Sequence, residues 1–154
     1  MARLLHDFNT EFDDAVPDVG LLSQRVAGFI ERDEAIFLLV GDAPDGMAEI
    51  RFRPSLMTGE LDAYLEELYV APPRRGQGLG RALLEGAMEA ARERGATHMD
   101  LGTSEADVAA RALYERAGFT NREGKPDGAR DVRLRTRALG RFTRDLTGNQ
   151  LAWT

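Results

Sequence analysis

The chain has 154 residues, of which 43% are hydrophobic and 30% charged. That length and balance are typical of one soluble globular domain. There is no cysteine, which excludes disulfides, thiolate metal sites and thiol catalysis. The two histidines, His6 and His98, lie far apart in sequence, so we expect no metal site. No long apolar segment or leader-like N-terminus is evident, which predicts a cytoplasmic protein with no membrane partner.

The net charge of −6 is divided unevenly along the chain. Residues 1–73 carry 5 arginines against 15 acidic residues, a balance of −10, whereas residues 74–154 carry 15 basic and 11 acidic residues, a balance of +4. The second half therefore suits an anionic ligand and the first half a cationic one, although solvated surface alone gives the same pattern. Four arginines stand within residues 130–137, but the acidic chain as a whole argues against a nucleic-acid partner.

In chain order, the first half of the sequence predicts four strands and one helix. A short apolar run predicts a strand over residues 2–8, and apolar residues at helical spacing predict a helix over 21–30. Residues 35–40 are apolar and bounded by charge, which predicts a buried strand. Residues 47–53 alternate and predict a half-solvated strand, and residues 61–70 predict another strand rich in β-forming side chains.

The second half predicts two helices that alternate with strands. A helix over residues 79–94 shows an apolar stripe at helical spacing, and a short strand over 97–102 follows it. Ser104 is the predicted N-cap of the next helix. The remaining segments are a strand opening at Phe119, a turn over 125–128, a strand over 131–137 and a tail over 140–154. This order predicts an α/β (α+β) fold, with one domain over residues 1–139 and helices on both faces of a mixed sheet.

A glycine-rich segment joins the strand over 61–70 to the helix that follows. Its sequence is Arg74-Arg75-Gly76-Gln77-Gly78-Leu79-Gly80-Arg81. Glycine permits positive φ and a close approach of ligand to backbone, and the first amides of a helix lack internal partners. A pyrophosphate fits there, with arginines adding charge-assisted contacts. The dinucleotide pattern fails at Arg81, and the P-loop pattern lacks its Gly-Lys-Ser/Thr ending. Taken alone, such a turn is often only structural.

Three segments resemble the GNAT superfamily of N-acetyltransferases. The first, Arg75-Gly76-Gln77-Gly78-Leu79-Gly80, fits the family signature of Arg or Gln, two residues, Gly, one residue, and Gly or Ala. The second, Leu68-Tyr69-Val70-Ala71-Pro72, is similar to the family's fourth strand and its exit. The third, Ala110 to Phe119, is similar to the family's A-x-x-L-Y-x-x-x-G-F helix end. The likeness covers about residues 61–122. It implies a mostly antiparallel sheet of about seven strands, splayed at strands 4 and 5, with acetyl-CoA in the gap.

The resemblance also implies how the donor is held. Backbone groups along Leu68, Tyr69 and Val70 would pair with the pantetheine arm, and the amide of Val70 would polarise the thioester carbonyl. The loop amides from Arg75 to Arg81 would hold the pyrophosphate. Asp107 stands where many family members have an Asn that contacts the CoA arm. An ionised Asp only accepts hydrogen bonds, so the alternative role of Asp107 is to cap its helix.

Two residues are implied in the chemistry. Tyr114 matches the family's general acid for the leaving thiolate, since a phenol pKa near 10 suits that transfer; the alternative is that it packs beside Leu113. Glu66 and Glu67 are adjacent in a predicted strand and point to opposite faces. The segment resembles the fourth strand of diamine acetyltransferases, in which a Glu at the first position relays a proton through water. This favours Glu66 as the base, and two plain surface carboxylates are the alternative.

The sequence therefore predicts an N-acetyltransferase that moves an acetyl group from acetyl-CoA to a small cationic primary amine. The attack would be direct, in a ternary complex and without a metal. One alternative is an enzyme that acetylates protein N-termini or lysines, and another is a non-catalytic CoA-binding regulatory module. Dimers are frequent among GNAT relatives, so a homodimer is one expected assembly.

Overall fold

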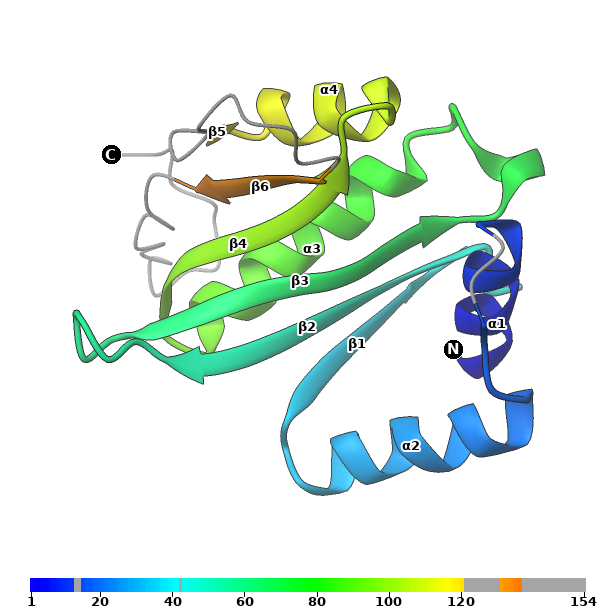
Figure 1. Ribbon diagram of the computed structural model, residues 1–154, viewed down its shortest axis with the longest axis horizontal. Coiled ribbons are helices and arrows are strands. Elements are labelled where there is room, and N and C mark those ends of the chain that lie inside the picture. The colour runs from blue at the N-terminus through cyan, green and yellow to red at the C-terminus, as the bar shows by residue number, and fades with distance from the viewer. Residues whose placement is uncertain (13–14, 42, 121–130, 137–154) are drawn as a thin grey trace, which may run out of the picture. The chain divides into compact units, whose positions relative to one another are not determined.

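The computed structural model describes residues 1–12, 15–41, 43–120 and 131–136. Figure 1 labels its helices and strands. The predicted turn over 125–128 and the predicted tail over 140–154 lie outside the described residues.

The chain divides into two compact units, and the first contains most of the predicted donor site. This unit comprises Met1–Phe52 and Tyr64–Ala87. Its elements are α1 (Ala2–Glu11), α2 (Val19–Glu31), β1 (Ala35–Val40), most of β2 (Gly46–Pro54), most of β3 (Leu61–Val70), a 3₁₀ helix (Pro72–Arg74) and the start of α3 (Leu79–Glu93). β1 and β2 pair antiparallel, and β2 lies between β1 and β3 (Figure 1).

Residues 2–8, predicted as a strand, belong to helix α1 instead. Leu4, Leu5 and Phe8 pack into one apolar cluster with side chains of β2 and β3. A helix places residues with this spacing on one side, whereas a strand would point Leu4 and Leu5 to opposite faces. The prediction was wrong because a short apolar run does not by itself distinguish a buried strand from a helix.

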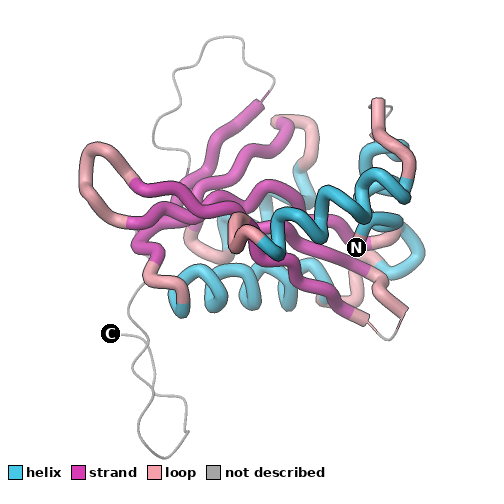
Figure 2. The backbone as a smooth tube through the Cα atoms, turned by 90° about the horizontal axis from the view of Figure 1, so that it is seen from below, coloured by secondary structure: helices cyan, strands magenta, loops and turns pink. Residues whose placement is uncertain are grey.

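Helices cover both faces of the strands in this first unit (Figure 2). On one face, α1 packs against Met47 of β2. On the other face, α3 approaches so closely that a Cβ on Gly86 would lie 3.3 Å from Leu38 Cδ1. Leu38 pairs with Ala48, the neighbour of Met47, and neighbours in a strand point to opposite faces. The predicted two-sided cover is therefore present in this unit.

β2 is buried more deeply than its alternating sequence predicted. All five residues from Gly46 to Ile50 are buried, including Glu49 at 8% exposure. The prediction of a half-solvated strand failed here because β2 has a strand on each side and helices over both faces. A carboxylate in such a position is unusual and calls for an explanation.

The second unit comprises Arg53–Ala63 and Met88–Thr154. Its elements are the remainder of α3, β4 (Ala96–Ser104), α4 (Val108–Arg116), β5 (Phe119–Thr120) and β6 (Asp131–Thr136), together with the turn between β2 and β3. β6 pairs antiparallel with both β4 and β5.

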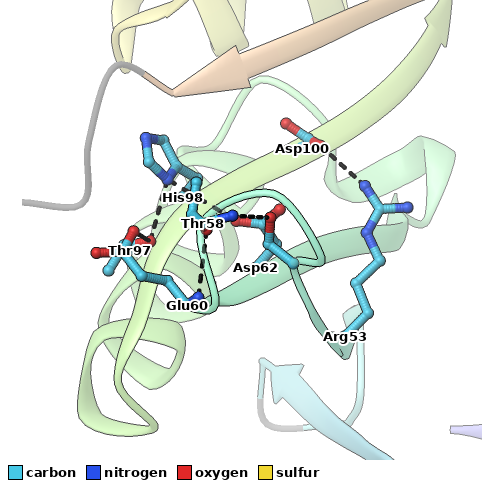
Figure 3. A network of polar contacts seen from close by, with 8 residues as sticks. Arg53, Thr58, Glu60, Asp62, Thr97, His98 and Asp100 are labelled. Atoms are coloured by element: carbon cyan, nitrogen blue, oxygen red, sulfur yellow. Dashed lines mark hydrogen bonds and ion pairs between the residues drawn. The ribbon is translucent and has the colours of Figure 1, made fainter.

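A polar network joins the β2–β3 turn to β4 within the second unit (Figure 3). Arg53 Nη2 donates to Asp100 Oδ2 at 3.1 Å, and Asp100 is only 4% exposed. His98 Nδ1 lies 3.8 Å from Asp62 Oδ1, so the His98 side chain belongs to this network. A buried carboxylate costs much less when a cation pairs with it. These contacts hold the turn between β2 and β3 against β4.

The described part of the chain holds six strands, in the order β1-β2-β3-β4-β6-β5. The expected number was about seven, and the difference is the N-terminal segment that forms α1. Each pair whose register is known, β1–β2, β4–β6 and β5–β6, is antiparallel.

Candidate active site

The glycine-rich segment forms the turn between β3 and α3. Gly76 and Gly78 have φ angles of 75° and 85°, a backbone region that side-chain-bearing residues rarely adopt. A Cβ on either residue would meet no atom of the described residues within 4 Å. The backbone conformation, and not a shortage of space, therefore requires glycine, and this side of the loop is open to a ligand.

The start of α3 presents backbone amides that no helical bond uses. The first bond of the helix runs from Ala82 N to Gly78 O, at 3.0 Å. The amides of Leu79, Gly80 and Arg81 precede it and have no intrahelical acceptor. They also stand at the positive end of the helix dipole. Together with the left-handed glycines, they can bind an anion through the backbone.

The three arginine side chains of this segment pair with carboxylates of the protein. The pairs are Arg74 with Asp45, Arg75 with Glu11 and Arg81 with Glu85, at 3.3, 2.8 and 2.7 Å. Two of these carboxylates lie outside the loop and helix, on α1 and before β2. The loop's anion-binding capacity therefore rests on its amides first.

Arg75 braces the loop against two other elements. Its Nε donates to Val70 O at 2.9 Å, at the end of β3, and its Nη2 donates to both carboxylate oxygens of Glu11 at 2.8 Å. The guanidinium also lies 5.7 Å from the centre of the Tyr69 ring. Burial, and after it the Glu11 carboxylate, raises the pKa of Tyr69. Arg75 thus ties the end of α1, the end of β3 and the glycine-rich turn together.

Replacing Arg75 with lysine tests this brace, because lysine keeps the charge but lacks the planar fork. We expect a double-mutant cycle with Glu11→Gln to give a coupling of about 1 kcal/mol, since both side chains are partly exposed and solvent screens the pair. Urea unfolding of the wild type, both single variants and the double variant measures it. Strictly additive losses would show that the two side chains do not act together.

The predicted pantetheine contacts and the predicted base all lie on β3. Tyr69 and Val70 are buried at 5% and 9% exposure, and Leu68 is half-buried. Glu66 is exposed, and Glu67 is half-buried. The Glu66 carboxylate therefore meets solvent from the strand that also carries the predicted pantetheine contacts.

Glu49 is a carboxylate of the site region that the sequence prediction missed. It lies on β2, opposite Phe37 of β1. Burial, the largest cause, raises its pKa above the ordinary value of 4.5, and the Glu66 carboxylate raises it further, while Arg51 lowers it. The sequence offered no signal, because Glu49 falls in an alternating strand where a polar residue predicts exposure.

The predicted acid, Tyr114, lies in the second unit near the end of α4. It is 6% exposed, and its ring lies 6.0 Å from that of Phe119. Asp107 is the N-cap of α4, and its Oδ1 accepts from Ala110 N at 2.9 Å. The cap is thus Asp107 and not the predicted Ser104, whose Oγ accepts from a loop amide instead.

Within the described residues, no three His, Asp or Glu side chains gather as a metal site would require. None of the helices in that part of the chain has the length and apolar character to cross a membrane.

Comparison with known proteins agrees with the motifs of this site. The family model of the Acetyltransferase (GNAT) family matches residues 1–119. Mycothiol acetyltransferase of Beutenbergia cavernae is 40% identical over 91 residues, which are 57% of this chain but only 29% of that protein. Aminoglycoside N(6')-acetyltransferase type 1 of Klebsiella aerogenes is 35% identical over 106 residues, 64% of this chain and 68% of that protein.

A solved structure from Arthrobacter sp. FB24, an acetyltransferase candidate, is similar over a larger share of the chain. It is 39% identical with a TM-score of 0.72, and the match covers 83% of this chain and 81% of that one. The sequence and the fold of this chain are therefore both similar to those of acetyltransferases.

Proposed function

Because the chain belongs to the Acetyltransferase (GNAT) family, we propose that it transfers an acetyl group from acetyl-CoA to a small cationic primary amine. The observation that carries the proposal is the loop from Arg75 to Arg81, with two left-handed glycines before the amides that open α3. The amine acceptor is supported by the aminoglycoside N(6')-acetyltransferase relative. The mycothiol acetyltransferase relative supports acyl transfer, although the similar segment is short.

The residues of the loop fit the pyrophosphate of acetyl-CoA. Its backbone amides supply donors, the open space beside Gly76 and Gly78 admits a phosphate, and the helix dipole favours negative charge. Leu68, Tyr69 and Val70 would align the pantetheine arm. Asp107 stays a predicted contact, although one of its oxygens already caps α4.

The co-substrate supplies an activated thioester, and the chain must position the amine and handle the protons. The amide of Val70 would hydrogen-bond the carbonyl oxygen, whose charge grows during attack. The hydroxyl of Tyr114 would donate a proton to the departing sulfur. Glu66 would carry the proton of the amine to solvent. Direct attack in a ternary complex needs no covalent enzyme intermediate.

Isothermal titration with acetyl-CoA, followed by a thiol-release assay on a panel of amines, tests the proposal. The panel would hold diamines, an aminoglycoside, free lysine and a peptide with a free N-terminus. We expect tight binding of acetyl-CoA and release of CoA with at least one small cationic amine. Binding without turnover on any amine would indicate a regulatory module, and turnover on the peptide alone would indicate a protein acetyltransferase.

Glu66→Gln tests the acceptor-side carboxylate. We expect kcat to fall by roughly 100-fold, the usual range for a positioned proton carrier. The loss should shrink at high pH, where the amine arrives already deprotonated. A pH series of kcat and KM measures both effects. Unchanged kcat with an unchanged pH profile would remove Glu66 from the mechanism.

A further inference from the structure

Glu49 is a buried carboxylate whose ion pair among the described residues is long. Its side chain is 10% exposed, and Oε1 contacts Arg51 Nη1 at 3.5 Å, the outer limit of a hydrogen bond. Among the described residues, Oε2 has no hydrogen-bond partner. Buried carboxylates are stable when hydrogen bonds and a nearby positive charge offset their desolvation. Glu49 therefore has capacity for a further donor.

Arg51 is held away from a close pair with Glu49. Its guanidinium carbon lies 4.1 Å from the centre of the Phe29 ring on α2, a geometry of favourable cation–π attraction. A guanidinium can form two short, parallel bonds to a carboxylate, but here it forms one long contact. This arrangement offsets part of the charge of Glu49 and leaves the second oxygen for another cation.

Apart from Arg51, the neighbours of Glu49 are apolar or negative. Phe37 stands directly opposite on β1, and directly opposite side chains of an antiparallel pair share one face. From β3, the Glu66 carboxylate acts on Glu49 and makes its ionised form less stable. Among the described residues, the charged groups that act on Glu49 are thus Arg51 on its own strand and Glu66 on β3. A small ammonium on a short hydrocarbon chain matches this environment.

We propose that Glu49 binds the protonated amine of the acceptor and accepts its proton before attack. This proposal rests on the function proposed above. One N–H bond of the ammonium breaks, its electron pair stays on nitrogen, and an O–H bond forms on Glu49. The O–H bond of Glu49 then breaks as its proton passes to the Glu66 carboxylate, which is exposed and releases the proton to water, so that both carboxylates return to their ionised form. Glu49 would thus select a cationic acceptor and also prepare it for reaction.

Binding of a simple diamine tests the first half of this proposal. The CoA-saturated protein is titrated with 1,4-diaminobutane at neutral pH, so that no acetyl transfer is needed for a result. We expect Glu49→Gln to weaken diamine binding by about 10- to 100-fold, the usual effect of removing a charged hydrogen-bond partner. CoA binding should be unchanged. Glu31→Gln, which removes an equal charge from an exposed position of α2, should change diamine binding less than about twofold.

Thermal stability tests whether Glu49 serves function or structure. Since the pKa of Glu49 is higher in the folded protein than the ordinary 4.5, its ionised form weakens the fold above that raised pKa. This loss of stability disappears as the pH falls to the ordinary value. Glu49→Gln should therefore raise Tm at pH 8, and the gain should shrink towards pH 4.5. A structural ion pair with Arg51 would give the opposite sign, a lower Tm in the variant.

The outcomes separate this proposal from the proposed function. Failure of the wild type to bind CoA would contradict the acetyltransferase proposal itself. Normal CoA binding with equal diamine affinity in wild type and Glu49→Gln, or no diamine binding by the wild type, would overturn the role of Glu49 alone. A lower Tm at pH 8 in a variant that binds diamine normally would assign Glu49 to structure.

Discussion

Tyr114→Phe should lower kcat by about 100-fold and leave the affinity for acetyl-CoA unchanged. The substitution removes one hydroxyl and keeps the ring, which lies 6.0 Å from Phe119 in the interior of the second unit. General acid catalysis by a positioned side chain contributes roughly 100- to 10,000-fold. An interaction made only in the transition state changes kcat without changing ground-state binding. Steady-state kinetics with acetyl-CoA and titration of CoA measure the two quantities separately.

The matched control for this prediction is Tyr64→Phe. It removes the same atom from a half-buried tyrosine of β3 to which no role in the reaction is assigned. We expect its kcat to stay within about twofold of the wild type, as for a substitution outside the reacting groups. Equal losses of kcat and acetyl-CoA affinity in Tyr114→Phe would show that the hydroxyl supports the structure of α4 and does not act as the acid.

The donor loop could be predicted from sequence because its physics is local. Gly76 and Gly78 are two positions apart, and the helix that follows begins at Leu79. Turn chemistry, free amides and helix dipole all depend on neighbours within a few positions. The family motif adds the ligand. The same holds for α3 itself, whose apolar spacing is continuous along the predicted range.

The contacts of Arg75 that hold the loop could not be predicted, because the partners of Arg75 are distant in sequence. Arg75 lies 64 residues after Glu11, and residues 2–8 of the helix that ends at Glu11 were predicted as a strand. An arginine in a phosphate-binding motif suggests contact with the phosphate. The structure instead shows its guanidinium bound to α1 and to the end of β3.

Glu49 illustrates a second limit of sequence patterns. Alternation along a strand indicates which residues share a face, but it does not state whether that face is covered. Here α1 covers the face of Met47, and Glu49 shares that face by its spacing of two. A buried carboxylate can be identified only once the covering helix is placed. Predictions from sequence are therefore weakest for buried polar groups, where functional residues are often found.

Gly76→Ala combined with Gly78→Ala should weaken acetyl-CoA binding by about 100-fold. Each alanine makes a left-handed backbone less favourable by roughly 1–2 kcal/mol, and both positions have φ near 80° in the loop. A Cβ at either position would meet no atom of the described part of the chain within 4 Å. No contact there prevents the loop from relaxing to negative φ. The amides then turn away from the phosphate, and binding must restore the strained conformation. Titration with acetyl-CoA measures the loss.

Gly95→Ala is the matched control, because Gly95 has a φ of 86° and equally open surroundings. It lies in the turn between α3 and β4, away from the donor loop in sequence. Gly95→Ala should lower the free energy of unfolding by about 1–2 kcal/mol, as each loop substitution does. Its acetyl-CoA affinity should stay within about twofold of the wild type. If Gly95→Ala weakened binding as much as the loop variant, general destabilisation would explain both losses. A loss confined to the loop variant means that acetyl-CoA depends on the left-handed geometry itself, and this geometry is the property that makes the backbone amides an anion site.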